Sequence, residues 1–301
     1  MFERKLKYLI IGGRSVIGSQ FASKVGRENY LLTSRQKVSP DTLMFDILVD
    51  DLNKKISNIE EYSHAILLPA APNIDACVNE KLMWKKVMVD GTKRIVDVLV
   101  ENDVTPVFLS SDYVFDGVYG NYTENDQTNP IVNYGRFKTI IENYLIRSKQ
   151  PHLIVRLSKV VGAFSGFRNI LWGWCEEIHR RGLIKCAIDH QFTPIDIGDA
   201  VEILEILCSK EYNGIFHICG TETFSHQTLF ELLCFVLKKR PRPITFQGKL
   251  ELCSINELNL MEVRPLNISM CPDKTIAATG IMPKSVASVC KEVAKQFNSD
   301  V

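Results

Sequence analysis

The fold class is decided by residues 6–25, which read LKYLIIGGRSVIGSQFASKV. An apolar strand over Leu6–Ile11 is followed at once by the glycine turn Gly12–Gly18 and by a helical stretch that runs toward Val25. Small residues in such a turn let backbone amides approach a dinucleotide pyrophosphate, and the N-terminus of the helix favours its negative charge. The stretch therefore predicts a dinucleotide site, with an ordinary strand-helix turn as the competing interpretation.

Further apolar runs predict a buried sheet built from several strands. They cover Tyr30–Thr33, His64–Leu68, the run from Val107 to Ser111, Leu153–Leu157 and Ile215–Cys219. Apolar residues at helical spacing predict helices over about 81–100, 134–145, 167–182, 226–236 and 285–297. In the third of these helices we expect Trp172 and Trp174 to pack in the core.

The composition is that of an ordinary globular protein. With 46% hydrophobic and 24% charged residues, a chain of 301 residues is long enough for one large domain or two smaller ones. Lys and Arg total 36 against 35 Asp and Glu, which gives no electrostatic case for binding nucleic acid or a membrane surface. The nine scattered cysteines form no Cys-x-x-Cys pair, so we expect reduced thiols, a cytoplasmic location and no metal site.

Candidate catalytic groups gather in residues 107–138. The apolar run from Val107 ends at Ser111, which brings a hydroxyl to the carboxyl end of a strand, where open parallel sheets bind ligands. Tyr134 and Lys138 lie four residues apart on the next helix and so share a face. An ammonium beside a phenol lowers the pKa of the phenol, and a serine nearby can bind the oxygen that gains or loses the proton. The set predicts hydride transfer between a nicotinamide and a carbonyl or carbinol carbon, against the simpler interpretation of a packed aromatic and a solvated lysine.

Ser111, Tyr134 and Lys138 resemble the Ser and Tyr-x-x-x-Lys set of the extended short-chain dehydrogenase/reductases. Within that branch, residues 111–117 (SDYVFDG), residues 122–126 (YTEND) and Pro130 are similar to the dTDP-4-dehydrorhamnose reductase group. The resemblance implies a Rossmann-type doubly wound parallel sheet with a smaller C-terminal substrate-binding region. We expect residues 1–160 to form an NADP-binding domain with the catalytic set. Residues 161–301 are then mainly substrate-binding, with segments at about 184–218 returning to the main sheet.

The resemblance also implies where the cofactor binds. The cofactor residues are Gly12, Gly13, Arg14, Ser15, Val16, Ile17, Gly18, Ser34, Arg35, Asp46, Ile47, Pro69, Ala70, Ala71, Tyr134 and Lys138. An acid after the second strand would bind a ribose 2'-hydroxyl, whereas Ser34 and Arg35 suit a 2'-phosphate, so NADP(H) is preferred over NAD(H). Arg14 is a second phosphate contact. Alternatively, either arginine is a surface charge, and Asp46 caps or solvates a turn.

The implied reaction is NADPH-dependent reduction of a nucleotide-linked 4-keto (6-deoxy) sugar. Hydride goes to the keto carbon, Tyr134 supplies the proton, and Lys138 lowers the pKa of that tyrosine and holds the nicotinamide ribose. Ser111, Tyr113 and Gln191 are the implied substrate contacts. The nucleotide sugar is the expected partner, and a homodimer is the candidate assembly.

Two alternatives remain open. One is a nucleotide-sugar epimerase or dehydratase, although dehydratases of this branch carry an Asp-Glu pair where this chain has Asp112 and Tyr113. The other is a non-catalytic, NADP-binding regulatory subunit, like that of methionine adenosyltransferase. Ser15 replaces a glycine and Met88 replaces an asparagine of the enzyme pattern, which favours the regulatory role. The intact Ser111, Tyr134 and Lys138 set favours turnover.

Overall fold

A computed structural model describes the protein over residues 6–37, 42–164, 167–240 and 243–300. It contains two compact units, and each is assembled from separate segments of the chain. The first unit comprises the residues up to Val114, Thr128–Arg156 and Val201–Phe216, and the second comprises Phe115–Gln127, Leu157–Ala200 and the residues from His217 onward. Residues 115–127, expected in the N-terminal domain, thus belong to the second unit.

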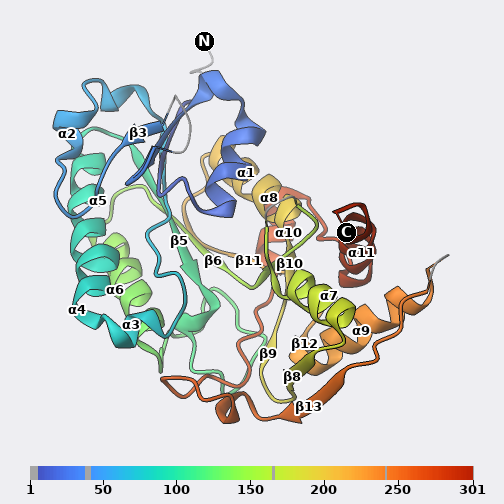
Figure 1. Ribbon diagram of the computed structural model, residues 1–301. Helices are drawn as coiled ribbons and strands as arrows, with labels where there is room; N and C mark the ends of the chain where they lie inside the picture. The colour runs from blue at the N-terminus through green and yellow to red at the C-terminus, as the bar shows by residue number, and fades with distance from the viewer. Residues whose placement is uncertain (1–5, 38–41, 165–166, 241–242, 301) are drawn as a thin grey trace. The chain divides into compact units, whose positions relative to one another are not determined.

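A seven-stranded sheet is the centre of the first unit (Figure 1). Its strands are β1 (Tyr8–Ile11), β2 (Tyr30–Ser34), β3 (Thr42–Met44), β4 (His64–Leu67), β5 (Thr105–Ser111), β6 (Leu153–Leu157) and β11 (Gly214–Ile218). They are ordered β11-β6-β5-β4-β1-β2-β3, and β1 pairs in parallel with both β2 and β4. This order confirms the predicted doubly wound sheet. The direction of winding reverses between β1 and β4, which is where such sheets bind ligands.

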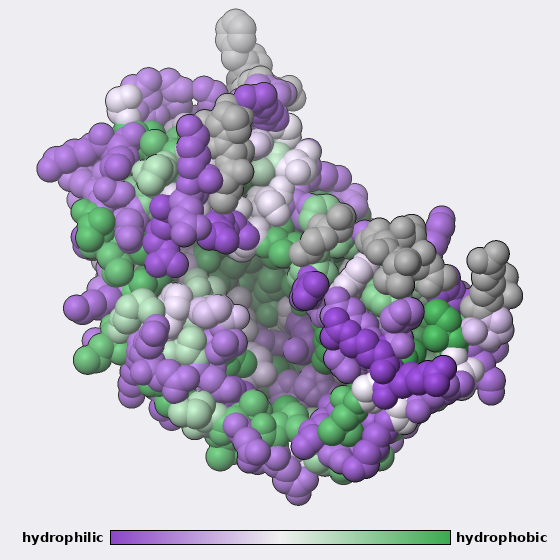
Figure 2. All heavy atoms as spheres, viewed as in Figure 1, coloured by the Kyte–Doolittle hydropathy of each residue, from purple (hydrophilic) through white to green (hydrophobic). Residues whose placement is uncertain are grey.

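Helices cover both faces of this sheet. They are α1 (Val16–Val25), α2 (Leu52–Lys55), α3 (Ala76–Asn79), α4 (Lys81–Lys85), α5 (Thr92–Glu101) and α6 (Asn133–Ser148), with short 3-10 turns η1 (Arg27–Asn29), η2 (Ile59–Glu61) and η4 (Asp112–Val114). Helix α1 lies on one face, and α5 and α6 lie on the other (Figure 1). The short α2 buries only Leu52, and the surface around it is mostly hydrophilic (Figure 2).

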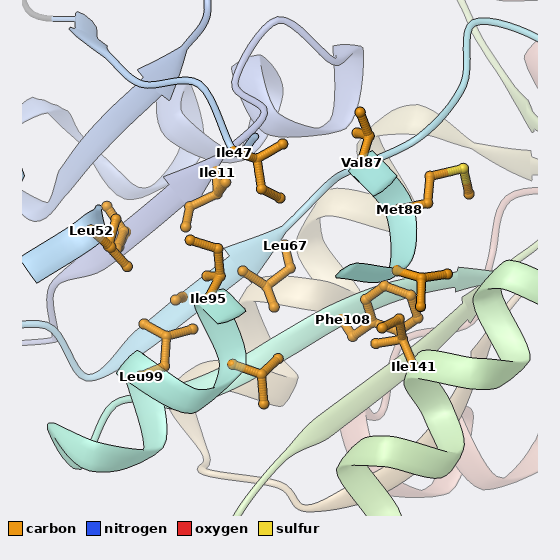
Figure 3. Packing of buried hydrophobic residues seen from close by; sticks show 14 of the residues in the cluster. Ile11, Ile47, Leu52, Leu67, Val87, Met88, Ile95, Leu99, Phe108 and Ile141 are labelled. Atoms are coloured by element: carbon orange, nitrogen blue, oxygen red, sulfur yellow. The ribbon is translucent and has the colours of Figure 1, made fainter. Parts of the chain in front are cut away.

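The main hydrophobic core of the first unit lies between the sheet and the α5–α6 face. Leu67 of β4 and Phe108 of β5 point toward the helices that carry Ile95, Leu99 and Ile141 (Figure 3). Side chains on alternate positions of β1 face the opposite way, where the ring of Tyr8 packs edge-on against Phe21 of α1 at 5.0 Å. A sheet buried on both faces explains why its strands are continuous apolar runs in the sequence.

The predicted helix over 81–100 is divided into three parts. A π-helical segment, η3 (Lys86–Gly91), separates α4 from α5. Gly91 ends this segment against the core, because a Cβ there would lie 2.8 Å from Cγ1 of Ile47. A π-helical segment of this kind is rare inside a helix, and no helical periodicity in the sequence reveals it.

In its described residues, the second unit has helices and three two-stranded pairings. Its pairs are β7 (Val160–Val161) with β10 (Ile195–Asp196), β9 (Gln191–Phe192) with β12 (Phe224–Ser225), and β8 (Leu183–Ala187) with β13 (Lys249–Cys253). Its helices are α7 (Ile170–Arg180), α9 (His226–Lys238), η5 (Ile255–Glu257), α10 (Asp273–Thr279) and α11 (Val286–Asp300), while α8 (Ile197–Ser209) continues into the first unit. Ser225 caps α9 as predicted.

Trp174 of α7 is buried as the sequence predicts, whereas Trp172 is half-buried. Trp172 meets the ring of Phe297 at 5.2 Å, and Trp174 meets Phe230 at 5.4 Å. Helix α7 begins later than expected because Asn169 caps its first turn by accepting a hydrogen bond from the amide of Leu171. Within the described ranges, none of the helices has the length and apolar character needed to cross a membrane.

Candidate active site

The glycine turn after β1 approaches its neighbours closely. Gly12 has φ of +94°, and a Cβ there would lie 3.2 Å from the main-chain oxygen of Leu68. A Cβ on Gly13 would lie 2.3 Å from the side chain of Leu32. Ser15 accepts a hydrogen bond of 3.0 Å from the amide of Gly18 and caps α1. The turn thus offers backbone amides, small side chains and a helix N-terminus at the carboxyl end of β1, which fits a dinucleotide pyrophosphate.

Arg14 is tied to the segment that follows β2. Its Nη1 donates a hydrogen bond of 2.5 Å to Oε1 of Gln36. The main-chain amide of Gln36 in turn donates to Oγ of Ser34 at 3.4 Å. Arg14 and Arg35 are both exposed. The structure therefore brings together the two chain segments that carry the predicted 2'-phosphate contacts, and Gln36 is a residue there that sequence reasoning missed.

Two of the expected adenine-side residues have structural roles. Asp46 accepts a hydrogen bond of 2.9 Å from the amide of Leu48 and so stabilises the turn after β3, which was the alternative for this residue. The side chain of Ile47 is buried in the core (Figure 3), and Arg94 donates to its main-chain oxygen. Val16 and Ile17 form the first turn of α1, and the side chain of Ile17 is also buried.

Ser111 ends β5 and is held by its neighbours. Its hydroxyl donates a hydrogen bond of 2.8 Å to Oδ1 of Asp112 and accepts one of 3.3 Å from the amide of Tyr113. Both Ser111 and Asp112 are buried. The hydroxyl thus has a fixed position at the carboxyl end of the sheet. Sequence reasoning did not identify Asp112 as its acceptor.

Tyr134 and Lys138 are on one face of α6, as predicted. Nζ of Lys138 donates to the main-chain oxygens of Leu109 at 2.6 Å and Pro69 at 3.1 Å, and it lies 5.6 Å from the ring centroid of Tyr134. The ring of Tyr113 meets that of Tyr134 edge-on at 6.4 Å. Two neighbouring strand ends, those of β4 and β5, therefore hold the lysine beside the tyrosine. Pro69 is buried, whereas Ala70 is exposed and Ala71 is half-buried.

The pKa values of this pair differ from the prediction. The pKa of Tyr134 is raised above its ordinary value, first by burial and then by the charges of Asp112 and Cys77. Burial lowers the pKa of Lys138 to about 7, while Glu142 and Cys77 act in the opposite direction. The expected lowering of the tyrosine pKa by Lys138 is therefore wrong for this arrangement, because burial disfavours the charged phenolate.

Gly135 permits the close packing that positions Tyr134. A Cβ at this residue would lie 2.0 Å from the main-chain oxygen of Tyr113 and 2.9 Å from the side chain of Pro130. The start of α6 can thus lie directly against η4. The glycine next to the candidate proton donor sets the distance between the helix and the end of β5.

Met88 occupies a fully buried position in η3. The side chain is 1% exposed, and Sγ of Cys77 lies 3.9 Å from its sulfur. An apolar thioether here contributes to the core shown in Figure 3. The residue therefore supplies packing where the enzyme pattern has an amide.

Gln191, the expected substrate contact of the second unit, is an exposed residue of β9. Its main-chain amide donates to the main-chain oxygen of Leu266 at 2.6 Å, and its main-chain oxygen accepts from the amide of Ile268 at 2.9 Å. The backbone is thereby fixed while the side chain remains accessible. Gln191 thus has a defined place within the second unit.

Sequence reasoning missed a buried charged network behind Lys138. Glu142 of α6 accepts hydrogen bonds from Arg156 of β6 at 2.8 Å and from the hydroxyl of Ser110 at 2.5 Å. The side chains of Arg156 and Glu142 are 3% and 2% exposed. The available signal was an acid four residues after Lys138, which places it on the same helix face. Over the described ranges, no group of three or more His, Cys, Asp and Glu residues is arranged to hold a metal ion.

Comparison with known protein families matches residues 6–299 to the family described as the RmlD substrate binding domain. A probable low-salt glycan biosynthesis reductase, Agl14, of Haloferax volcanii is 23% identical over 76% of this chain and 79% of its own length. The dTDP-4-dehydrorhamnose reductase of Aggregatibacter actinomycetemcomitans is 24% identical over 60% of this chain and 65% of its own. Methionine adenosyltransferase 2 subunit beta of Danio rerio is 27% identical over 43% of this chain and 42% of its own length. The matches to the last two thus span less than two thirds of those relatives.

Solved structures share the fold over nearly the whole chain. A dTDP-4-dehydrorhamnose reductase from Clostridium acetobutylicum has a TM-score of 0.81 at 20% identity, covering 97% of this chain and 100% of its own. The enzyme of the same name from Bacillus anthracis, in complex with NADP, has a TM-score of 0.77 at 19% identity, covering 99% and 100%. MoeE5 in complex with UDP-glucose and NAD has a TM-score of 0.80 at 16% identity, covering 98% and 99%.

Proposed function

The chain belongs to the RmlD substrate binding domain family, and on this premise we propose that it is an NADPH-dependent reductase of a nucleotide-linked 4-keto (6-deoxy) sugar. The observation that carries the proposal is the pair of Tyr134 and Lys138 on α6, with Lys138 bound to the main chain of Leu109 two residues before Ser111. A phenol, an ammonium and a hydroxyl at the carboxyl end of a doubly wound sheet suit an NAD(P)-dependent oxidoreductase.

The proposed chemistry assigns one task to each side chain. A bound nicotinamide supplies the hydride that reduces the keto carbon. Ser111 turns its proton from Asp112 to the keto oxygen and so orients the substrate. The raised pKa of Tyr134 keeps its phenol protonated at neutral pH, as a general acid requires, and the phenol donates to the alkoxide that develops on that oxygen. Lys138, when protonated, stabilises the resulting phenolate.

We propose NADP(H) as the cofactor because Arg14 and Arg35 offer charge for a 2'-phosphate. Gln36 holds the guanidinium of Arg14 over the segment that contains Arg35. Titration of the wild-type protein with NADPH and NADH, and of an Arg14→Ala, Arg35→Ala variant, tests this choice. We expect the variant to lose affinity for NADPH while affinity for NADH stays the same. Equal losses for both cofactors would contradict the assignment.

The reductase is tested by supplying NADPH and a panel of enzymatically generated 4-keto-6-deoxy nucleotide sugars. We expect oxidation of NADPH that is stoichiometric with reduced sugar and that disappears in Tyr134→Phe. Stoichiometric consumption also separates a reductase from an epimerase or dehydratase, which return the cofactor to its starting state. Reduction of some other carbonyl, with every 4-keto sugar ignored, would refute the proposed substrate.

A regulatory subunit is the second candidate, favoured by two observations. Relatives named methionine adenosyltransferase 2 subunit beta match this chain, and Met88 fills its position with a packed thioether. Such a subunit would bind NADPH without oxidising it and would copurify with a partner enzyme at fixed stoichiometry. Tight NADPH binding combined with no turnover on the full panel would place this candidate first.

A further inference from the structure

A column of three polar side chains runs along the buried face of α6. Tyr134, Lys138 and Glu142 are spaced four residues apart, so they lie one above another on the helix. Lys138 and Glu142 are each 2% exposed. Burying an ammonium and a carboxylate on one helix face is costly unless each is paired and hydrogen-bonded. The column therefore requires an explanation beyond packing.

Strands β5 and β6 fix Glu142, the last residue of the column. Nε and Nη2 of Arg156 donate to the Glu142 carboxylate at 3.2 Å and 2.8 Å, and Ser110 donates to its Oε1. These contacts hold the carboxylate against rotation. Three consecutive residues of β5 have separate roles. Leu109 accepts a hydrogen bond from Lys138, Ser110 donates one to Glu142, and Ser111 supplies the candidate catalytic hydroxyl.

The charges in the column alternate toward the candidate site. Arg156 is positive, Glu142 negative and Lys138 positive when protonated, and the phenol of Tyr134 comes last. The groups that face Lys138 are Glu142 and Tyr134 on its own helix, the carbonyls of Pro69 and Leu109 from the strand ends, the ring of Phe108, and Cys77. Among them Glu142 is the carboxylate that favours the ammonium.

We propose that Glu142, oriented by Arg156 and Ser110, is a positioning residue that keeps Lys138 protonated beside Tyr134. The role in catalysis rests on the proposed reductase function, whereas the charge coupling is a property of the folded protein alone. Burial lowers the pKa of Lys138 to about 7 even with Glu142 in place, so loss of the carboxylate would leave more of the lysine neutral, and a neutral amine would stabilise a phenolate less. Glu142 thus acts through Lys138 and does not contact the reacting atoms.

The test uses a double variant, Glu142→Gln with Arg156→Met, since Glu142→Gln alone would leave a buried arginine unpaired and is expected to be strongly destabilising. Lys138→Met, made in the wild-type and double-variant backgrounds, isolates the titration of Lys138. We measure the free energy of unfolding against pH in all four proteins, and kcat and NADPH affinity against pH where Lys138 is present. Arg156→Lys and Ser110→Ala are matched controls that disturb the same network while leaving the Glu142 charge in place.

In the double variant, we expect the midpoint attributable to Lys138 to move from about 7 to lower pH by on the order of one unit, and kcat at neutral pH to fall about fivefold. The midpoint should stay in place in Arg156→Lys and Ser110→Ala, even where these variants are less stable. An unmoved midpoint in a folded double variant would overturn the proposal. Wild-type protein that shows the stability midpoint but oxidises no NADPH would refute the reductase instead, so the two failures are distinguishable.

Discussion

The side-chain nitrogen of Lys138 donates a hydrogen bond of 2.6 Å to the main-chain oxygen of Leu109, which joins the middle of α6 to the end of β5. Each element carries a candidate catalytic group within four residues of this hydrogen bond, Tyr134 on the helix and Ser111 on the strand. This hydrogen bond, together with the close packing at Gly135, fixes the relative placement of the two groups. The protonation state of Lys138 links stability to pH.

Replacing Lys138 by methionine should increase stability at low pH. The pKa of Lys138 in the folded protein, about 7, is below its ordinary value of 10.5, so the folded state binds fewer protons between these values. The cost of burying the charge is complete below pH 7 and disappears as the pH rises toward 10.5. We expect Lys138→Met to unfold at higher temperature than wild type at pH 6, with the difference shrinking above pH 7. A constant difference across this range, measured by thermal unfolding, would contradict the assigned pKa.

Replacing Tyr134 by phenylalanine should remove turnover without removing the fold. Loss of a general acid typically lowers rates by about 10² to 10⁴. The ring remains to pack against Tyr113, so we expect the unfolding midpoint and NADPH affinity to stay close to the wild-type values. Single-turnover kinetics and a fluorescence titration check the two parts. A variant that keeps more than a tenth of the wild-type rate would assign the proton to another group.

Gly135→Ala should destabilise the protein even though alanine favours helices. A Cβ there would lie 2.0 Å from the main-chain oxygen of Tyr113, so α6 or η4 must shift. We expect a loss of about 2 kcal/mol in the free energy of unfolding, despite a gain of about 1 kcal/mol from helix propensity. Gly173→Ala in α7 is the matched control, because no atom of the described residues lies within 4 Å of its added Cβ. Equal stabilisation of both variants would contradict the close approach.

The cap on α1 can be measured at Ser15. Its hydroxyl accepts from the amide of Gly18, so Ser15→Ala should cost about 1 kcal/mol and Ser15→Gly only a few tenths. Chemical denaturation gives both values. If the serine also serves the pyrophosphate, Ser15→Gly should bind NADPH at least as tightly, since glycine lets the backbone approach more closely. A large loss of affinity in this variant would show that the hydroxyl itself is required.

The stacked histidines of the second unit predict sensitivity to acid. His190 and His226 lie 5.2 Å apart, and burial lowers the pKa of His190 to about 2 and of His226 to about 3. The folded state binds fewer protons than the unfolded state from pH 6.5 down to these values, so stability falls as the pH falls. Each histidine contributes at most about 1.4 kcal/mol per pH unit. His226→Phe should flatten the dependence of unfolding on pH between 6 and 4, and an unchanged slope would contradict the pKa shift.

The sequence predicts those features that depend on neighbouring residues. The strand and glycine turn at residues 8–18 and the spacing of Tyr134 and Lys138 are local patterns, and the structure has them as expected. The pairing order of the sheet was available only through the resemblance to a known fold, since no apolar run specifies which strand lies beside it. Gln191 was likewise placed by resemblance, and its fixed backbone depends on residues 266 and 268, far along the chain.

The remaining features depend on contacts between distant segments. Glu142 reads as an ordinary helix-surface acid until β6 brings Arg156 beside it. Gly91 of η3 approaches Ile47, which belongs to another segment of the chain. The pKa of Tyr134 is raised chiefly because burial disfavours the phenolate, and the extent of burial is a property of the whole unit.

The discontinuous first unit has a consequence for synthesis on the ribosome. Strand β11 at the edge of its sheet follows residues 157–200 in the chain, which are a segment of the second unit. Until that segment has been translated, β6 lacks its outer neighbour, and an open strand edge is a template for pairing with other nascent chains. The N-terminal sheet therefore cannot be completed as it leaves the ribosome, and a gene truncated before residue 214 should yield an aggregating product.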